Sequence, residues 1–134
     1  MPRPDPLRAL LVLRRIEAEA AKVQLMEAAA RQERADAVLQ RHAQALKAEA
    51  DHGDGDAFAA WFPRARDAAE QAAATLALAE ASSAEARAAA AATSLAEKVT
   101  QQELQRQAAI RRAARLEKEQ HELGDITKAS AEES

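Results

Sequence analysis

The chain has 134 residues, of which hydrophobic types make up 48%, charged types 31% and aromatic types 2%. Alanine supplies most of the hydrophobic residues and buries little area, so the composition excludes a thick globular core and favours long helices or a coiled coil. The net charge is -3, and the interleaving of acidic and basic residues argues against general nucleic-acid binding. The absence of cysteine excludes disulfides, a thiol nucleophile and a zinc-thiolate site.

A first helix is predicted over about residues 6–51. Asp5 is a suitable N-cap, and Pro6 fits the first helical turn because its missing N–H costs nothing there. Neither glycine nor proline occurs between Pro6 and Gly53. The longest apolar run near the N-terminus, residues 9–13, is too short to span a bilayer, so we expect a soluble protein without a cleaved signal or direct membrane insertion.

The apolar residues of this helix fall on two faces. One is a heptad seam that consists of Leu11, Ala18, Leu25, Gln32, Leu39 and Leu46, with Leu7, Ala21, Ala28 and Ala35 beside it. The other lies on the opposite side of the helix and consists of Val12, Leu13, Ile16, Ala20 and Val23. One antiparallel partner helix cannot cover both faces.

The chain can reverse direction only near residues 52–56, where Gly53 and Gly55 lie. The acidic residues there do not have the spacing of an EF-hand loop, and Phe62 stands where that loop needs its glutamate. We therefore interpret the stretch as a polar turn. Trp61 and Phe62 are predicted to close the open end of the hairpin; exposed aromatic residues there would instead indicate a docking point.

A second helix is predicted over about residues 57–123, with an alternative start or a kink at Pro63. Residues 81–94 contain no large apolar side chain. A heptad line then follows, made of Leu95, Gln102, Ala109, Leu116 and Leu123, with Val99 and Ala113 beside it. Gly124 is a natural stop signal, so residues 124–134 are predicted to be a disordered tail.

These elements predict an all-α fold: an antiparallel two-helix coiled-coil hairpin in which helix 2 is longer than helix 1, forming a single domain over residues 1–134. A turn at residues 53–55 places residues 81–94 opposite residues 14–27, where Ile16, Val23, Leu25 and Met26 lie. It also places Leu95 and Val99 opposite residues 7–13. About twenty residues of helix 2, roughly 104–123, are left without a partner helix.

The unpartnered segment combines apolar and basic residues. Leu104, Ile110, Leu116 and Leu123 are the apolar ones, beside an arginine cluster made of Arg106, Arg111, Arg112 and Arg115. No acidic residue lies between Glu103 and Glu117. This pattern indicates a binding surface for protein, lipid or nucleic acid, or alternatively a solvated helix face, and the stacking aromatics of single-strand binders are absent.

Nothing in the sequence predicts an enzyme. His42, His52 and His121 are far apart and form no ligand pair, and phosphate-binding glycine loops and nucleophile elbows are absent. We expect no catalytic residue, no metal site and no cofactor.

The sequence resembles the FliJ family, the coiled-coil stalk proteins of the flagellar type III export apparatus, and the related stalk proteins of injectisomes. The segments that carry the resemblance are D-P-L-R-A-L-L-V-L-R-R-I-E-A-E-A-A (5–21), A-W-F-P-R-A-R (60–66) and L-E-K-E-Q-H-E-L-G-D-I (116–126). It covers nearly the whole chain.

The resemblance implies a cytoplasmic stalk, peripheral at the membrane-bound export apparatus. Its partners would be the hexameric export ATPase, the export gate and chaperones, and its functional surface would lie towards the helix termini. The candidate partner-binding residues are then Leu7, Leu11, Arg14, Arg15, Ile16, Leu104, Arg106, Ile110, Arg111, Arg112, Arg115, Leu116 and Leu123. Two alternatives stay open: a structural spacer, a homodimeric four-helix rod that buries the second face of helix 1 against another copy, and an amphipathic helix on a membrane surface. Weak homo-oligomerisation of the stalk itself also stays open.

Overall fold

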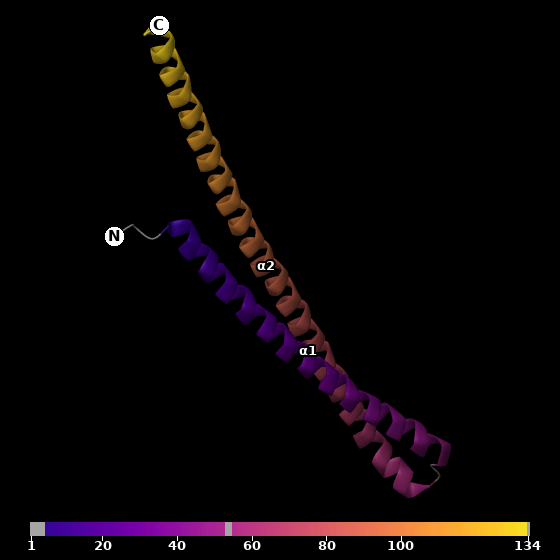
Figure 1. Ribbon diagram of the computed structural model, residues 1–134. Helices are drawn as coiled ribbons and strands as arrows, with labels where there is room; N and C mark the ends of the chain where they lie inside the picture. Colours follow the sequence, from indigo (N-terminus) through magenta and orange to yellow (C-terminus); the bar gives the residue numbers. More distant parts are fainter. Residues whose placement is uncertain (1–4, 53–54, 134) are drawn as a thin grey trace. The chain divides into compact units, whose positions relative to one another are not determined.

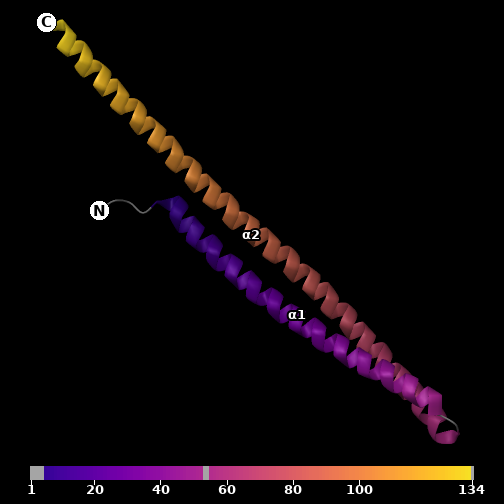
Figure 2. The ribbon, with the colours of Figure 1, turned by 45° about the vertical axis from the view of Figure 1, so that its right-hand side comes forward.

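The computed structural model describes residues 5–52 and 55–133, and it is all-α. Helix α1 spans Pro6–His52 and helix α2 spans Asp56–Glu132. The two helices pack against each other as a hairpin whose second helix is the longer, which confirms the predicted fold class. Figures 1 and 2 show the last turns of α1 beside the first turns of α2.

The start of α1 is capped as predicted. The backbone N–H of Leu7 donates to Oδ1 of Asp5 at 3.0 Å, and the N–H of Ala9 donates to the Asp5 carbonyl at 3.2 Å. Asp5 thus satisfies amides that have no partner within the helix. At the turn, Gly55 has a φ of +99°, a backbone conformation that side-chain-bearing residues rarely adopt. Gly53 and Asp54 lie outside the described residues.

Helix α2 is continuous from Asp56 and contains Pro63. The predicted alternative start at Pro63 is therefore wrong. A proline inside a helix leaves the carbonyl four residues earlier without its donor. That carbonyl belongs to Ala59, and both residues are exposed, so water can supply the missing hydrogen bond.

The predicted end of the second helix at Leu123 is also wrong, because α2 passes through Gly124 and ends at Glu132. Glycine ends a helix when it adopts a left-handed conformation, and Gly124 does not have a positive φ. Without that conformation glycine costs an exposed helix about 1 kcal/mol relative to alanine but does not by itself end the helix. Residues 124–132, predicted to be a disordered tail, are helical.

The described chain divides into two compact units, although the sequence predicts a single domain. Unit 1 combines residues 1–15 with residues 95–134, and unit 2 comprises residues 16–94. Each unit contains a part of both helices.

In unit 2 the side of α1 that faces α2 follows the predicted heptad seam. Its buried or half-buried residues alternate in steps of three and four: Ala18, Ala21, Leu25, Ala28, Gln32, Ala35, Leu39, His42 and Leu46. The facing residues of α2 are mostly small, and Ala72 and Ser83 are buried. Small residues on one side of the contact let two helices approach closely.

The large apolar residues of the second α1 face point outward, as the helical periodicity predicts. Ile16, Val23 and Met26 are exposed. The expectation that these three side chains pack against residues 81–94 is therefore wrong, because the same helix turns Leu25 and Ala28 towards α2 instead. Near the turn, the ring centroid of Phe58 lies 5.9 Å from that of Trp61 and 5.5 Å from that of Phe62. Trp61 is half-buried and Phe62 is exposed.

In unit 1 the start of α1 packs on the middle of α2. Leu11 and Thr100 are buried there, and the hydroxyl of Thr100 donates to the Ala96 carbonyl at 2.8 Å. Leu7, Leu104 and Gln107 are half-buried. After Gln107, every described residue of α2 is exposed.

Leu95 and Val99 are not buried against α1 as predicted. They are 61% and 53% exposed, because the side of α2 that faces α1 carries Thr93, Thr100 and Gln107 at heptad spacing. The predicted interface of α2 contained these two larger side chains. The observed contact with α1 instead uses the smaller, more polar residues Thr93, Thr100 and Gln107.

Candidate partner-binding surface

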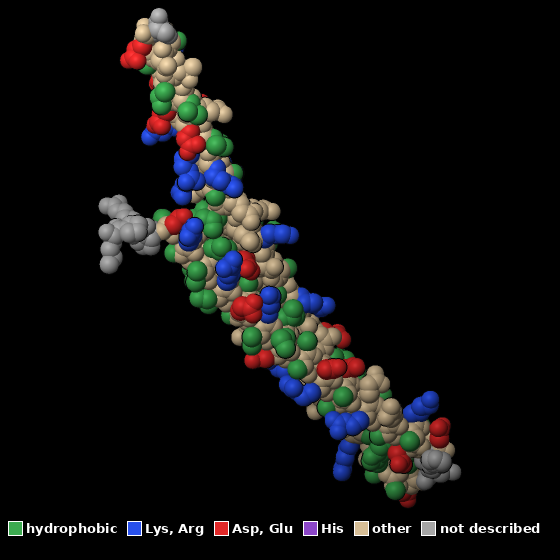
Figure 3. All heavy atoms as spheres, in the orientation of Figure 1, with side chains coloured by type: hydrophobic (Ala, Val, Ile, Leu, Met, Phe, Trp, Pro, Cys, Tyr) green, Lys and Arg blue, Asp and Glu red, His purple; other side chains and the backbone are tan. Residues whose placement is uncertain are grey.

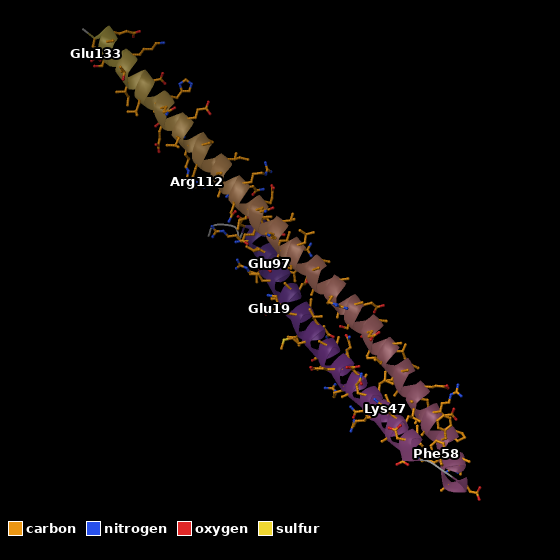
Figure 4. All side chains as sticks on the ribbon, turned by 90° about the vertical axis from the view of Figure 1, so that its right-hand side faces the viewer. Glu19, Lys47, Phe58, Glu97, Arg112 and Glu133 are labelled. Atoms are coloured by element: carbon orange, nitrogen blue, oxygen red, sulfur yellow. The ribbon has the colours of Figure 1, made fainter. Side chains whose placement is uncertain are left out.

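The candidate surface lies in unit 1, on α2 beyond Gln107. Figure 3 shows this stretch as a group of Lys and Arg side chains, followed towards the C-terminal end by acidic and hydrophobic ones. In Figure 4 the side chains from Arg112 to Glu133 project on all sides of the helix. The residues of this segment are thus available to a partner.

The four arginines of the cluster differ in their surroundings. Arg106 donates two hydrogen bonds to the carboxylate of Glu103, from Nε at 2.9 Å and from Nη2 at 2.6 Å. These hydrogen bonds lower the pKa of Glu103 and raise that of Arg106. The charge of Arg106 is therefore balanced on its own helix. The lack of acidic residues between Glu103 and Glu117 did not indicate this pair, because Glu103 itself is the partner.

Arg111, Arg112 and Arg115 form no ion pair with any residue that the structure describes. All three are exposed. Arg111 borders a shallow groove where α1 begins, lined also by Asp5, Leu10 and Gln107. These three arginines are the unbalanced positive charge of the surface.

On α1, the predicted arginine Arg15 forms an ion pair within unit 1. Nε of Arg15 lies 3.6 Å from Oε1 of Glu97, so this charge is paired across the two helices. Arg14 is half-buried in the seam between Leu11 and Ala18. Both arginines therefore belong to the helix pair as well as to the predicted site.

The predicted apolar site residues separate into an internal and an external group. Leu11 is buried and Leu7 and Leu104 are half-buried, so these side chains hold α1 and α2 together. Ile110, Leu116 and Leu123 are exposed. Ile16 is exposed as well, but it belongs to unit 2.

Five further exposed apolar residues of unit 1 were not among the predicted site residues: Val12, Leu13, Leu95, Val99 and Ile126. Leu95, Leu116 and Leu123 are separated by whole numbers of heptads, which was visible in the sequence. It did not by itself reveal which side of α2 faces α1.

The charge of α2 changes sign along the exposed segment. Residues 106–115 contain only basic charges. The segment that follows is mainly acidic, with Lys118 and Lys128 against six carboxylates: Glu117, Glu119, Glu122, Asp125, Glu132 and Glu133. The surface is therefore basic near the end of α1 and acidic towards the end of α2.

Neither helix contains, within the described ranges, a stretch both long and apolar enough to cross a membrane. Among the same residues, no group of three or more His, Asp or Glu side chains is placed to hold a metal ion. No protein-family model, no curated protein and no solved structure matches the chain.

Proposed function

We propose that the protein is a non-enzymatic stalk and escort protein of a flagellar-type (type III) export apparatus. In this proposal unit 1 binds the hexameric export ATPase and other export components, such as the export gate and chaperones. The protein would act in the cytoplasm, at the membrane-bound apparatus. The resemblance of residues 5–21, 60–66 and 116–126 to the FliJ family supports this function.

The single observation that carries the proposal is the exposed end of α2. A long helical segment without a partner, with unbalanced arginines beside apolar side chains, is typical of a helix that docks on another protein. Ile110, Leu116 and Leu123 would pack against apolar side chains of the ring. Arg111, Arg112 and Arg115 would meet acidic loops, and catalysis would belong to the ATPase.

The test is the rate of ATP hydrolysis by the cognate export ATPase with and without this protein. We expect the wild-type chain to stimulate hydrolysis. A chain with Arg111→Glu, Arg112→Glu and Arg115→Glu is expected to lose the stimulation, because acidic residues would repel the acidic loops.

A matched control carries the same charge change in unit 2. Arg31, Arg34 and Arg41 are exposed and form no ion pair among the described residues. A chain with these three residues changed to Glu should stimulate hydrolysis as well as the wild type. Equal stimulation by the unit 1 variant would contradict the proposal.

The exposed second face of α1 favours a different function, a self-associating structural spacer with no ATPase partner. In unit 2 this face presents Ile16 and Val23 to solvent. A spacer would bury them against a second copy. Sedimentation at low micromolar concentration distinguishes the two functions, since a stable dimer that is lost on Ile16→Gln and Val23→Gln substitution supports the spacer.

A further inference from the structure

The exposed part of α2 in unit 1 carries an apolar stripe with coiled-coil spacing. Its members follow one another in steps of four and three residues: Ala109, Ala113, Leu116, Gln120 and Leu123. Leu116 and Leu123 are 59% and 64% exposed.

The stripe lies on the side of α2 that faces away from α1. Ala109 follows Gln107, the last half-buried residue of the interface, by two positions. Two positions turn a helix by about 200°. A second helix could therefore cover the stripe without displacing α1.

Charges flank the stripe in an order that selects the direction of such a helix. Arg111, Arg112 and Arg115 precede its midpoint, and Glu117, Glu119 and Glu122 follow it. None of these six side chains forms an ion pair with a residue in the described part of the chain. A parallel second copy would place the basic half of the segment beside the basic half of its partner, whereas an antiparallel copy places it beside the mainly acidic half.

We propose that residues 109–123 of α2 pair with the same residues of a second copy of this chain, antiparallel and centred on Leu116. This pairing needs no export component and does not depend on the proposed function. It differs from the spacer hypothesis, which uses the outer face of α1.

The register follows from the charges and side-chain sizes. Centring on Leu116 places the two copies of Leu116 together and sets the small Ala109 against Leu123 of the second copy. Arg112 and Glu119 are seven residues apart, so they lie on the same flank of the stripe. In an antiparallel pair equal flanks face each other, and Arg112 therefore meets Glu119 of the second copy.

The expected association is weak. Only two leucines per copy lie in the stripe, and exposed ion pairs contribute little each. We expect a dissociation constant on the order of 100 µM, within reach of sedimentation equilibrium on the full chain at up to about 1 mM.

Charge reversal in two separate chains gives the decisive test. One chain carries Arg111→Glu, Arg112→Glu and Arg115→Glu; the other carries Glu117→Lys, Glu119→Lys and Glu122→Lys. Each alone should associate at least about tenfold more weakly than wild type, a change of about 1.4 kcal/mol. Mixed in equal amounts they should form a heterodimer, because residue 112 of each chain again meets a residue 119 of opposite charge.

Two controls separate this pairing from other contacts. Leu116→Gln should abolish the dimer while the circular dichroism of the chain stays helical. Ile16→Gln with Val23→Gln should leave the dimer intact, since these residues belong to the outer face of α1. A wild-type chain that is monomeric at about 1 mM, or two reversed chains that fail to associate when mixed, would overturn the proposal.

Cross-linking tests the direction directly, because the chain has no cysteine of its own. Chains with Ala109→Cys and chains with Leu123→Cys should form disulfides with each other. Like residues would lie about 21 Å apart in the antiparallel pair, too far to form a disulfide. Preferential disulfides between like residues would indicate a parallel pair and contradict the proposal.

Discussion

At the scale of single residues, alanine decides how α1 and α2 pack in unit 2. Ala18, Ala28 and Ala35 of α1 and Ala72 of α2 are buried, whereas Leu25, Leu39 and Leu46 are only half-buried. Alanine gains little free energy from burial but allows a close approach of two backbones. The helix pair therefore depends on positions where there is no room for a longer or charged side chain.

Replacing Ala28 by glutamate tests this dependence. Ala28 is 1% exposed, so the new carboxylate would be buried or would separate the helices. We expect the free energy of unfolding to fall by about 1–3 kcal/mol. Ala29→Glu is a matched control on the exposed side of the same helix. Thermal unfolding followed by circular dichroism compares the two variants, and equal midpoints would show that Ala28 is not in the interface.

The Glu103–Arg106 pair gives a prediction on pH. Its hydrogen bonds depress the pKa of Glu103 in the folded state, so its stabilising contribution is present above the unfolded-state pKa and is lost as the pH falls through the folded value. Carboxyl NMR titration should report a pKa below the usual range for glutamate. Arg106→Gln should return it to that range, while Arg112→Gln should leave it depressed; an ordinary pKa in the wild type would contradict the pair.

At the scale of the elements, the ends of the two helices depend on backbone conformation more than on residue identity. Asp5 and Pro6 specify the start of α1 because their hydrogen bond and fixed φ serve that position alone. Gly124 is ambiguous, since glycine is compatible both with a helix end and with a helix interior. In this protein Gly55 has the left-handed conformation and Gly124 does not.

The two glycines are predicted to respond in opposite ways to alanine. Gly124→Ala should raise the helical circular dichroism signal and stabilise the end of α2 by about 1 kcal/mol. Gly55→Ala should destabilise the turn by about 1–2 kcal/mol, because alanine disfavours the φ of +99°. A loss of helical signal in Gly124→Ala would indicate that α2 ends at Leu123 after all.

At the scale of the whole molecule, the sequence predicts the fold class. It also predicts which side of α1 contacts the other helix, but not which side of α2 does so. The seam of α1 is predicted correctly because large apolar residues such as Leu25 and Leu39 alternate with polar ones at a clear heptad spacing. The contact side of α2 is not, because small residues such as Thr93 and Ala90 carry no hydrophobic signal, whereas Leu95 and Val99 do. The more apolar side of a helix therefore need not be the side that contacts the other helix of the hairpin.

Only part of the candidate surface could be predicted from the sequence. The exposure of Arg111, Arg112 and Arg115 follows from the difference in helix length. The pairing of Arg106 with Glu103 depends on side-chain conformations that the sequence does not fix. The roles of Leu7, Leu11 and Leu104 as contacts within unit 1 depend on the helix register, which residue spacing determines only to within about one turn.

The exposed end of α2 is proposed to bind the export ATPase. Hydrogen exchange of the full chain, with and without the assembled ring and at low micromolar concentration to avoid self-association, tests it most directly. The proposal predicts that amides of residues 108–126 exchange more slowly when the ring is present, while those of residues 30–80 are unchanged. Unchanged exchange at residues 108–126 with a saturating amount of ring, or protection confined to unit 2, would contradict it.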